Sequence, residues 1–131
     1  MKRSVVLGTM MMLGLSGVAL AGLRESDAVY VNSSSASPSG QGTVGDPRSS
    51  VDTHQYIGCG VTSYAAGGSY ASCSATDANG KSAYCYTYDA DLRQTVLGIK
   101  GDSYLAFFGN KSTGECTAII VTNASSYAPK R

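Results

Sequence analysis

Three tyrosines at alternate positions, Tyr84, Tyr86 and Tyr88, are the side chains of this sequence best suited to recognise a ligand. Side chains in a β-strand alternate between two faces, so these rings share one face if the segment is a strand. Exposed aromatic rings stack on sugars or bases, and phenol hydroxyls form hydrogen bonds. We therefore predict a tyrosine-lined binding face. The alternative is that the rings face the core, or cover a sheet only because tyrosine favours strands.

Four cysteines predict two disulfides rather than a metal site. They are Cys59, Cys73, Cys85 and Cys116. A zinc site is usually built from closely paired ligands such as C-x-x-C, and this chain offers no such pair and a single histidine, His54. We expect neither a metal nor a cofactor.

Catalytic chemistry has little support in the sequence. His54 is the only histidine, and no G-x-S-x-G nucleophile elbow is present. Asp89 and Asp91 form a D-x-D pair that could bind a divalent cation, but capping of a helix explains both more simply. Residues 40–45 match G-x-G-x-x-G without a preceding hydrophobic strand, which indicates a chance match. We predict that the protein is not an enzyme and has no catalytic residues.

The N-terminal 21 residues have the pattern of a secretory signal peptide. Lys2 and Arg3 precede an apolar run, and Ala19-Leu20-Ala21 is a small-x-small cleavage site. The alternative, a membrane anchor, requires a longer apolar run. We expect a secreted or periplasmic product with no membrane span after cleavage. The formal net charge is +1 and becomes slightly negative without Lys2 and Arg3, which argues against a nucleic-acid partner.

The remaining chain divides into a segment at 22–52 and a disulfide-stabilised β domain at 53–131. The first holds a short predicted strand at 28–31 and a Ser/Gly/Pro-rich stretch that we expect to be flexible. In the second, alternation and turn signals predict five strands, at 55–64, 69–76, 82–88, 103–108 and 116–122. Both faces of the last strand are apolar, so it should be the most buried. Asp91 and Gln94 form a capping-box pattern that opens a short helix over 91–100.

The order of three strands, one helix and two strands resembles the OB-fold, a five-stranded Greek-key barrel with its helix between the third and fourth strands. The predicted fold is therefore mainly β, a small five-stranded OB-like barrel or sheet with one short helix and two disulfides. In OB-like barrels the second and third strands form the ligand face, which is where the three tyrosines fall. The alternative is another small β sheet or sandwich with one helix.

Hairpin geometry leaves two disulfide pairings open. A three-residue loop at 78–80 places Cys73 opposite Cys85, and a turn centred on Ala66 places Cys59 opposite Cys73. Either Cys59 bonds Cys73 and Cys85 bonds Cys116, or Cys73 bonds Cys85 and Cys59 bonds Cys116. The OB-fold resemblance favours the first pairing, because there the third strand runs beside the fifth.

Three segments resemble those of small four-cysteine exported bacterial proteins to which no function is assigned. They are Gln55-Tyr56-Ile57-Gly58-Cys59, Cys85-Tyr86-Thr87-Tyr88-Asp89 and Ser126-Tyr127-Ala128-Pro129. This resemblance implies no activity and no site. The sequence therefore predicts a secreted, non-catalytic binding module. It does not identify the ligand, and the candidate partners are an oligosaccharide and another secreted protein. The alternative is a structural, protein-interaction or inhibitor component of the cell envelope or extracellular matrix.

Overall fold

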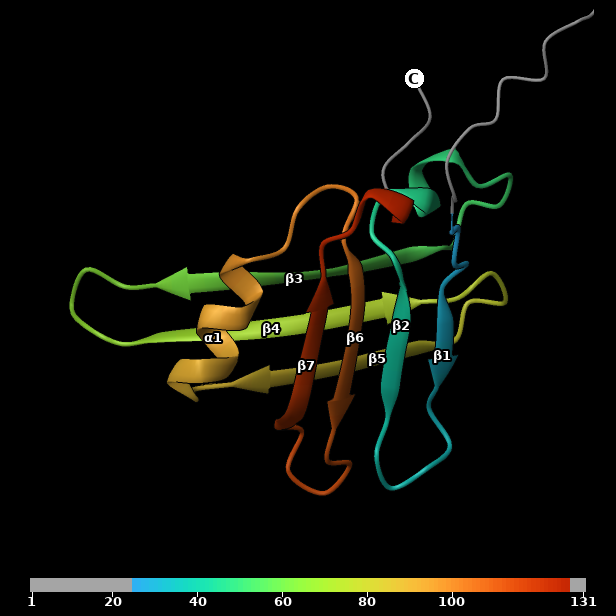
Figure 1. Cartoon of the computed structure of the whole chain (residues 1–131). Helices are drawn as coiled ribbons and strands as arrows, with labels where there is room; N and C mark the ends of the chain where they lie inside the picture. The colour runs from blue at the N-terminus through green and yellow to red at the C-terminus, as the bar shows by residue number, and fades with distance from the viewer. Residues whose placement is uncertain (1–24, 128–131) are drawn as a thin grey trace, which may run out of the picture.

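The computed structural model describes residues 25–127, and the predicted signal peptide lies outside these residues. Two antiparallel sheets pack face to face, and their strands cross steeply (Figure 1). Sheet A has the order β1-β2-β6-β7. Its strands are β1 (Tyr30–Asn32), β2 (Ser39–Thr43), β6 (Tyr104–Gly109) and β7 (Cys116–Thr122). Sheet B consists of β3 (Tyr56–Ser63), β4 (Ser69–Thr76) and β5 (Ser82–Thr87).

The expected fold class is confirmed in its coarse features, a mainly β chain with one helix and two disulfides. The OB-like barrel is wrong, because the described chain has seven strands in two separate sheets and no barrel closes. Strand β1 overlaps the short N-terminal strand that the sequence predicted, whereas β2 is missing from that prediction; the two pair with each other, and β2 pairs with β6. Sheet A is thereby completed from the N-terminal segment, and the product is a two-layer sandwich.

Strand β2 lies inside the Ser/Gly/Pro-rich segment that we expected to be flexible. Its Gly40 faces sheet B, where an added Cβ would lie 2.6 Å from the Cβ of Ala75 and 2.8 Å from the ring of Phe107. The absence of a side chain therefore lets the two layers approach closely at this point. Hydrophobic patterning cannot show such a strand, because it has no apolar side chain. The G-x-G-x-x-G letters begin within this strand rather than in a turn before a helix.

The two hairpins of sheet B have the predicted registers. Cys59 lies opposite Cys73, and Cys73 lies opposite Cys85. In the second turn, the carboxylate of Asp77 accepts hydrogen bonds from the backbone N–H groups of Asn79 and Lys81, each at 2.9 Å. Gly80 then adopts a φ of 81°, a conformation that glycine tolerates.

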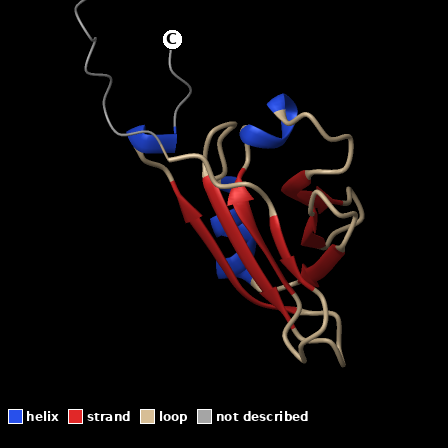
Figure 2. Cartoon of the chain, turned by 90° about the vertical axis from the view of Figure 1, so that its right-hand side faces the viewer, coloured by secondary structure: helices blue, strands red, loops and turns tan. Residues whose placement is uncertain are grey.

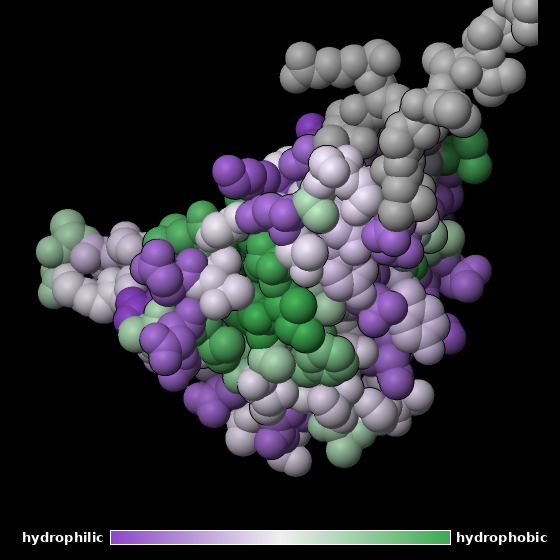
Figure 3. Space-filling model, viewed as in Figure 1, coloured by the Kyte–Doolittle hydropathy of each residue, from purple (hydrophilic) through white to green (hydrophobic). Residues whose placement is uncertain are grey.

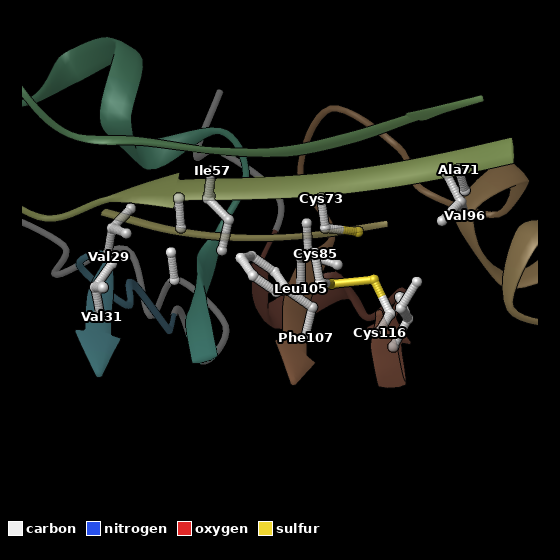
Figure 4. Close-up of a cluster of buried hydrophobic side chains, with 13 residues drawn as sticks. Val29, Val31, Ile57, Ala71, Cys73, Cys85, Val96, Leu105, Phe107 and Cys116 are labelled. Carbon is white, nitrogen blue, oxygen red and sulfur yellow. A yellow bond between two sulfur atoms is a disulfide. The ribbon is translucent and has the colours of Figure 1, made fainter. Parts of the chain in front are cut away.

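One disulfide, Cys59–Cys73, lies within sheet B. The other, Cys85–Cys116, joins sheet B to sheet A and is drawn as the yellow bond in Figure 4. This is the first of the two predicted pairings, but the reason differs from the expected one. β5 and β7 belong to different sheets that face each other, so they are not neighbours in a barrel. Two disulfides are compatible with an oxidising extracellular or periplasmic location.

The core lies between the sheets, and its largest fully buried side chains are Phe107 and Leu105 of β6 (Figure 4). Strand β6 is therefore more buried than β7, contrary to the expectation from the apolar sequence of β7. The reason is topological, since β7 forms an edge of sheet A and one of its faces is turned outward. Ile120 of β7 is 48% exposed as a result.

Helix α1 (Ala90–Leu97) covers the part of sheet B that sheet A leaves open (Figure 1). It begins one residue earlier and ends three residues earlier than predicted, and its N-cap is Asp89 rather than Asp91. The Asp89 carboxylate accepts a hydrogen bond from the Leu92 N–H at 2.9 Å. Val96 is buried in the core cluster with Ala71 (Figure 4).

Two short 3-10 helices, η1 (Asp46–Ser49) and η2 (Ser125–Tyr127), lie at one end of the molecule (Figure 2). There the two ends of the described chain meet, because the Glu25 N–H donates to the Ser126 carbonyl at 2.8 Å. Tyr127 stacks on Tyr104 with ring centroids 5.7 Å apart. This pairing ties both ends to sheet A.

Among residues 25–127, no helix is long and apolar enough to cross a membrane.

Candidate functional site

The three alternating tyrosines lie on the outer face of strand β5, away from the core. Tyr84 is 56% exposed and Tyr88 is 66% exposed, whereas Tyr86 is half-buried. The residues between them, Ala83 and Cys85, are buried in the core. The rings are therefore available to solvent, and their presence is not explained by packing between the sheets.

Neighbouring strands extend this group into a continuous row of four rings, which we call the tyrosine row. The centroids of Tyr86 and Tyr88 are 5.9 Å apart, those of Tyr88 and Tyr70 are 6.1 Å apart, and those of Tyr70 and Tyr64 are 6.5 Å apart. Tyr84 lies on the same face and makes no ring contact with any described residue. The tyrosine row thus runs across sheet B, whereas the predicted ladder ran only along β5.

Sequence reasoning missed Tyr64 and Tyr70. The register that places Cys73 opposite Cys85 also places Tyr70 opposite Tyr88 when it is extended by three residues. This cross-strand tyrosine pair was therefore available from the predicted hairpin. Tyr64 follows β3 in the turn to β4, so its ring contact with Tyr70 depends on the path of that turn.

The rings of the tyrosine row are tilted against one another rather than coplanar. Their interplanar angles are 78° for Tyr86–Tyr88, 52° for Tyr70–Tyr88 and 28° for Tyr64–Tyr70. Tyr86 is held in place by its hydroxyl, which donates to the Thr113 carbonyl at 3.3 Å. Its ring also lies against Gly114, where a Cβ would come within 3.2 Å. The surface of the tyrosine row is therefore uneven, and its rings do not form a flat aromatic plane.

The hydroxyls of Tyr64 and Tyr70 interact with each other. The pKa of Tyr64 is raised above 10.0, first because ionised Tyr70 would repel a second phenolate and also because the two hydroxyls form a hydrogen bond. This direction means that the surroundings stabilise the protonated Tyr64 phenol, whose hydroxyl is directed at that of Tyr70.

Small side chains fill the sheet surface between the tyrosines. Gly58 lies opposite Ser74, and Gly60 lies opposite Ser72. The Tyr56 hydroxyl lies over Gly58, 2.8 Å from the position that a Cβ would take. None of the residues in β3, β4 and β5 is charged. We call this outer surface of sheet B, together with Tyr64 and Tyr88, the tyrosine face.

The candidate residues outside the tyrosine row include two aspartates, Asp89 and Asp52, which form structural hydrogen bonds, and His54. Asp89 caps α1, and the Asp52 carboxylate accepts hydrogen bonds from Gln55 and from the backbone N–H of His54. The His54 side chain is exposed. Within residues 25–127, no group of three or more His, Cys, Asp or Glu side chains is placed to hold a metal ion.

An open cavity of about 480 Å³ lies between η1 and the loop before β6. Its charged lining residues are Asp46, Arg48 and Asp102. The Arg48 guanidinium donates to the Gly101 carbonyl at 3.0 Å, and Asp46 accepts a hydrogen bond from Ser26 at 2.7 Å. These contacts tie η1 to the neighbouring segments of the chain.

The chain matches no protein-family model, no curated protein and no solved structure.

Proposed function

We propose that this chain is a secreted or periplasmic, non-catalytic binding protein that holds a neutral oligosaccharide on its tyrosine face. The observation that supports this proposal best is the tyrosine row, four rings in contact across an uncharged sheet surface. Covering exposed tyrosine rings with a ligand removes apolar surface from water, which favours binding. Tyrosine also has a hydroxyl, so it suits a ligand that has both apolar and polar surfaces.

The chemistry of the tyrosine face matches that of a sugar. Ring faces can pack against the C–H surfaces of a pyranose, while phenol and serine hydroxyls can hydrogen-bond its hydroxyl groups. A charged ligand would find no opposite charge within the three strands. Because the rings are tilted, the surface suits a short or branched oligosaccharide better than the flat face of a crystalline polysaccharide.

The size of the tyrosine face also favours a small ligand. Strands of eight residues and a width of three strands give a sheet about 26 Å long and about 14 Å wide. The projected area is roughly 360 Å², less than half of the about 800 Å² that each partner contributes to a standard protein interface. One copy of the chain is therefore better matched to a few sugar units than to a whole protein surface.

An NMR titration of the oxidised protein with pooled neutral oligosaccharides tests this proposal. We expect amide shifts that cluster on Tyr64, Tyr70, Tyr84 and Tyr88. The double variant Tyr64→Ser/Tyr88→Ser should lose most of the binding, because it removes two exposed rings of the tyrosine row. No shifts from any pool, or shifts confined to sheet A, would rule the proposal out.

Tyr30 supplies a matched control. It is 59% exposed, as Tyr64 is, but lies in sheet A. Tyr30→Ser therefore removes an equally exposed ring away from the tyrosine face and should leave binding unchanged. An equal loss of binding in both variants would show that the tyrosine row is not the site.

A second candidate function, a structural or inhibitory protein-interaction role in the cell envelope or matrix, is favoured by a different surface. Figure 3 shows hydrophobic residues gathered over the outer side of sheet A and α1. Exposed hydrophobic side chains of these elements are Ile120 of β7, 48% exposed, and Leu97 of α1, 65% exposed. Apolar patches of this kind are typical of protein contacts.

A photo-crosslinking residue at Ile120 would test this second function in the native envelope. The control position is Val51, which is fully exposed in a loop away from the patch. We expect one protein to be crosslinked from Ile120 and not from Val51. The same set of proteins from both positions would count against a specific partner.

A further inference from the structure

Within residues 25–127 the two sheets have four edge strands, and three of these are shortened or covered. β1 has only three residues. The edge of β5 is met by the loop at Gly114 and Glu115, because the Tyr86 N–H donates to the Gly114 carbonyl at 3.1 Å. β7 lies beside α1, and Asn123, just beyond β7, donates to the Gly98 carbonyl at 3.1 Å. Natural proteins protect sheet edges by such means.

The fourth edge, β3, is neither short nor bonded along its backbone to a loop; α1 contacts β3 as well as β7, but on the face of sheet B that is turned toward sheet A (Figure 1). Strand β3 is eight residues long, pairs with β4 without a bulge, and contains no proline and no charged residue. The loop containing Pro47, Arg48 and Gln55 lies beside Tyr56 and Ile57, so the open part of the edge runs from Gly58 to Ser63. An uncharged edge of this length is a template for another strand.

The free backbone groups of β3 belong to alternate residues. Cys59 and Cys73 are a closely spaced pair, with Cα atoms 4.0 Å apart, which marks a non-hydrogen-bonded pair of an antiparallel ladder. The N–H and C=O groups of Cys59 therefore point away from β4, and the same alternation turns those of Val61 and Ser63 outward. These groups form no hydrogen bond with any other described residue.

We propose that the β3 edge pairs antiparallel with the β3 edge of a second copy of this chain, centred on Val61. Val61 then lies opposite the same residue of the second copy, and Cys59 lies opposite Ser63. Each such pair exchanges two backbone hydrogen bonds, and the paired segment avoids the end of β3 that the Pro47 loop borders. Because β3 carries no charge, the antiparallel arrangement brings no like charges together.

The outer face of the joined sheet supports this register. Gly60 faces Thr62 of the second copy, and Gly58 faces Tyr64 of the second copy. A cross-strand aromatic ring compensates for the missing side chain of a strand glycine, and here it would arrive beside Tyr56, whose hydroxyl already lies over Gly58. The tyrosine faces of two copies thus become one surface on a six-stranded sheet.

This inference does not depend on the proposed oligosaccharide, because self-association is measured without any ligand. Sedimentation equilibrium of the oxidised protein should show a monomer–dimer equilibrium. A strand-edge contact is at the small end of interface sizes, so the dimer should be weak. Hydrogen exchange followed by NMR should show that the amides of Cys59, Val61 and Ser63 gain protection as the protein concentration rises.

The variant Gly60→Lys tests the edge directly. A Cβ at Gly60 meets no atom within 4 Å, so a lysine is accommodated in the monomer. It places one ammonium group from each copy near the dimer axis and should weaken association about tenfold, equivalent to about 1.4 kcal/mol. Gly60→Ser adds a small neutral side chain at the same position, and Ser74→Lys adds the same charge to the same face on the central strand. Both controls should dimerise as the unmodified protein does.

Three results would overturn the proposal. One is a protein that stays monomeric at millimolar concentration. Another is a dimer that forms without protection of the three outward-facing amides, which would place the contact elsewhere. The third is protection of these amides only when an uncharged extended peptide is added, which would identify a different chain as the occupant of the β3 edge.

Discussion

Cys85 of β5 is bonded to Cys116 of β7, and this disulfide cross-links the two sheets. Cys59–Cys73, by contrast, connects neighbouring strands of sheet B that a short turn already holds together. The two bonds therefore constrain the unfolded chain to different extents.

We expect the double variant Cys85→Ala/Cys116→Ala to lose more stability than Cys59→Ala/Cys73→Ala. The bonds close loops of 31 and 14 residues, for which chain entropy gives about 3.7 and about 3.0 kcal/mol. Urea unfolding of both variants and of the unmodified protein measures the difference. A larger loss from the Cys59–Cys73 variant would show that the within-sheet bond matters more than loop length predicts.

Asp52 should make the fold sensitive to acid. Hydrogen bonds, first from the Gln55 side chain and then from the backbone of Gln55 and His54, lower the pKa of Asp52 from 3.8 to about 2. A carboxyl whose pKa is lower in the folded state stabilises the fold above its unfolded pKa of 3.8 and loses this contribution as the pH falls toward 2. Gln55 in turn accepts a hydrogen bond from the Val29 N–H at 3.0 Å. Protonation of Asp52 should therefore also weaken the attachment of the segment that leads into β1 of sheet A.

Urea unfolding at several pH values between 2 and 6 tests this effect in the unmodified protein and in Asp52→Asn. The variant should be less stable at pH 6, and its stability should fall less between pH 4 and pH 2. Asp91→Asn removes the same charge from a carboxylate that accepts no hydrogen bond from any described residue. Identical pH profiles for Asp52→Asn and the unmodified protein would refute the role of Asp52.

Gly40 should be among the glycines that tolerate substitution least. Gly40→Ala forces a Cβ to within 2.6 Å of Ala75 and 2.8 Å of the Phe107 ring, so the layers must separate. We expect a loss of about 1 to 3 kcal/mol by overpacking. Gly60→Ala, which meets no atom within 4 Å, should be neutral or stabilising by up to about 1 kcal/mol. Thermal or urea unfolding distinguishes the two, and equal effects would argue against a close approach of the sheets at β2.

The N-cap of α1 can be assigned by comparing two aspartates. Asp89→Ala should cost about 0.5 to 2 kcal/mol, because the Leu92 N–H loses its hydrogen-bond acceptor. Asp91→Ala should cost about 0.5 kcal/mol or less, since its carboxylate only contributes charge near the helix start. Measuring the free energy of unfolding of both variants shows which aspartate is the N-cap of α1. If Asp91→Ala costs more, the capping box read from the sequence is correct.

Sheet B could be predicted well because its signals are local. β4 and β7 have the predicted bounds, and the ends of β3, β5 and β6 differ from the predicted ends by no more than one residue. Alternation defines these strands, and turn residues such as Gly80 set the hairpin registers that bring Cys59, Cys73 and Cys85 into one row. The same registers contained the Tyr70–Tyr88 contact, which was missed because only one strand was considered.

By itself, the sequence determined the mainly β class, the hairpins of sheet B and the two disulfide pairings that those hairpins allow. Only the tertiary structure decided that Cys85 bonds Cys116, that β2 completes sheet A, and that the rings of Tyr84 and Tyr88 face solvent. Each of these features depends on how sheet A packs against sheet B. The sequences of strands that are far apart in the chain do not show how those strands pack. A strand alternation identifies two faces, but the packing of sheet A on one side of sheet B decides which face is buried.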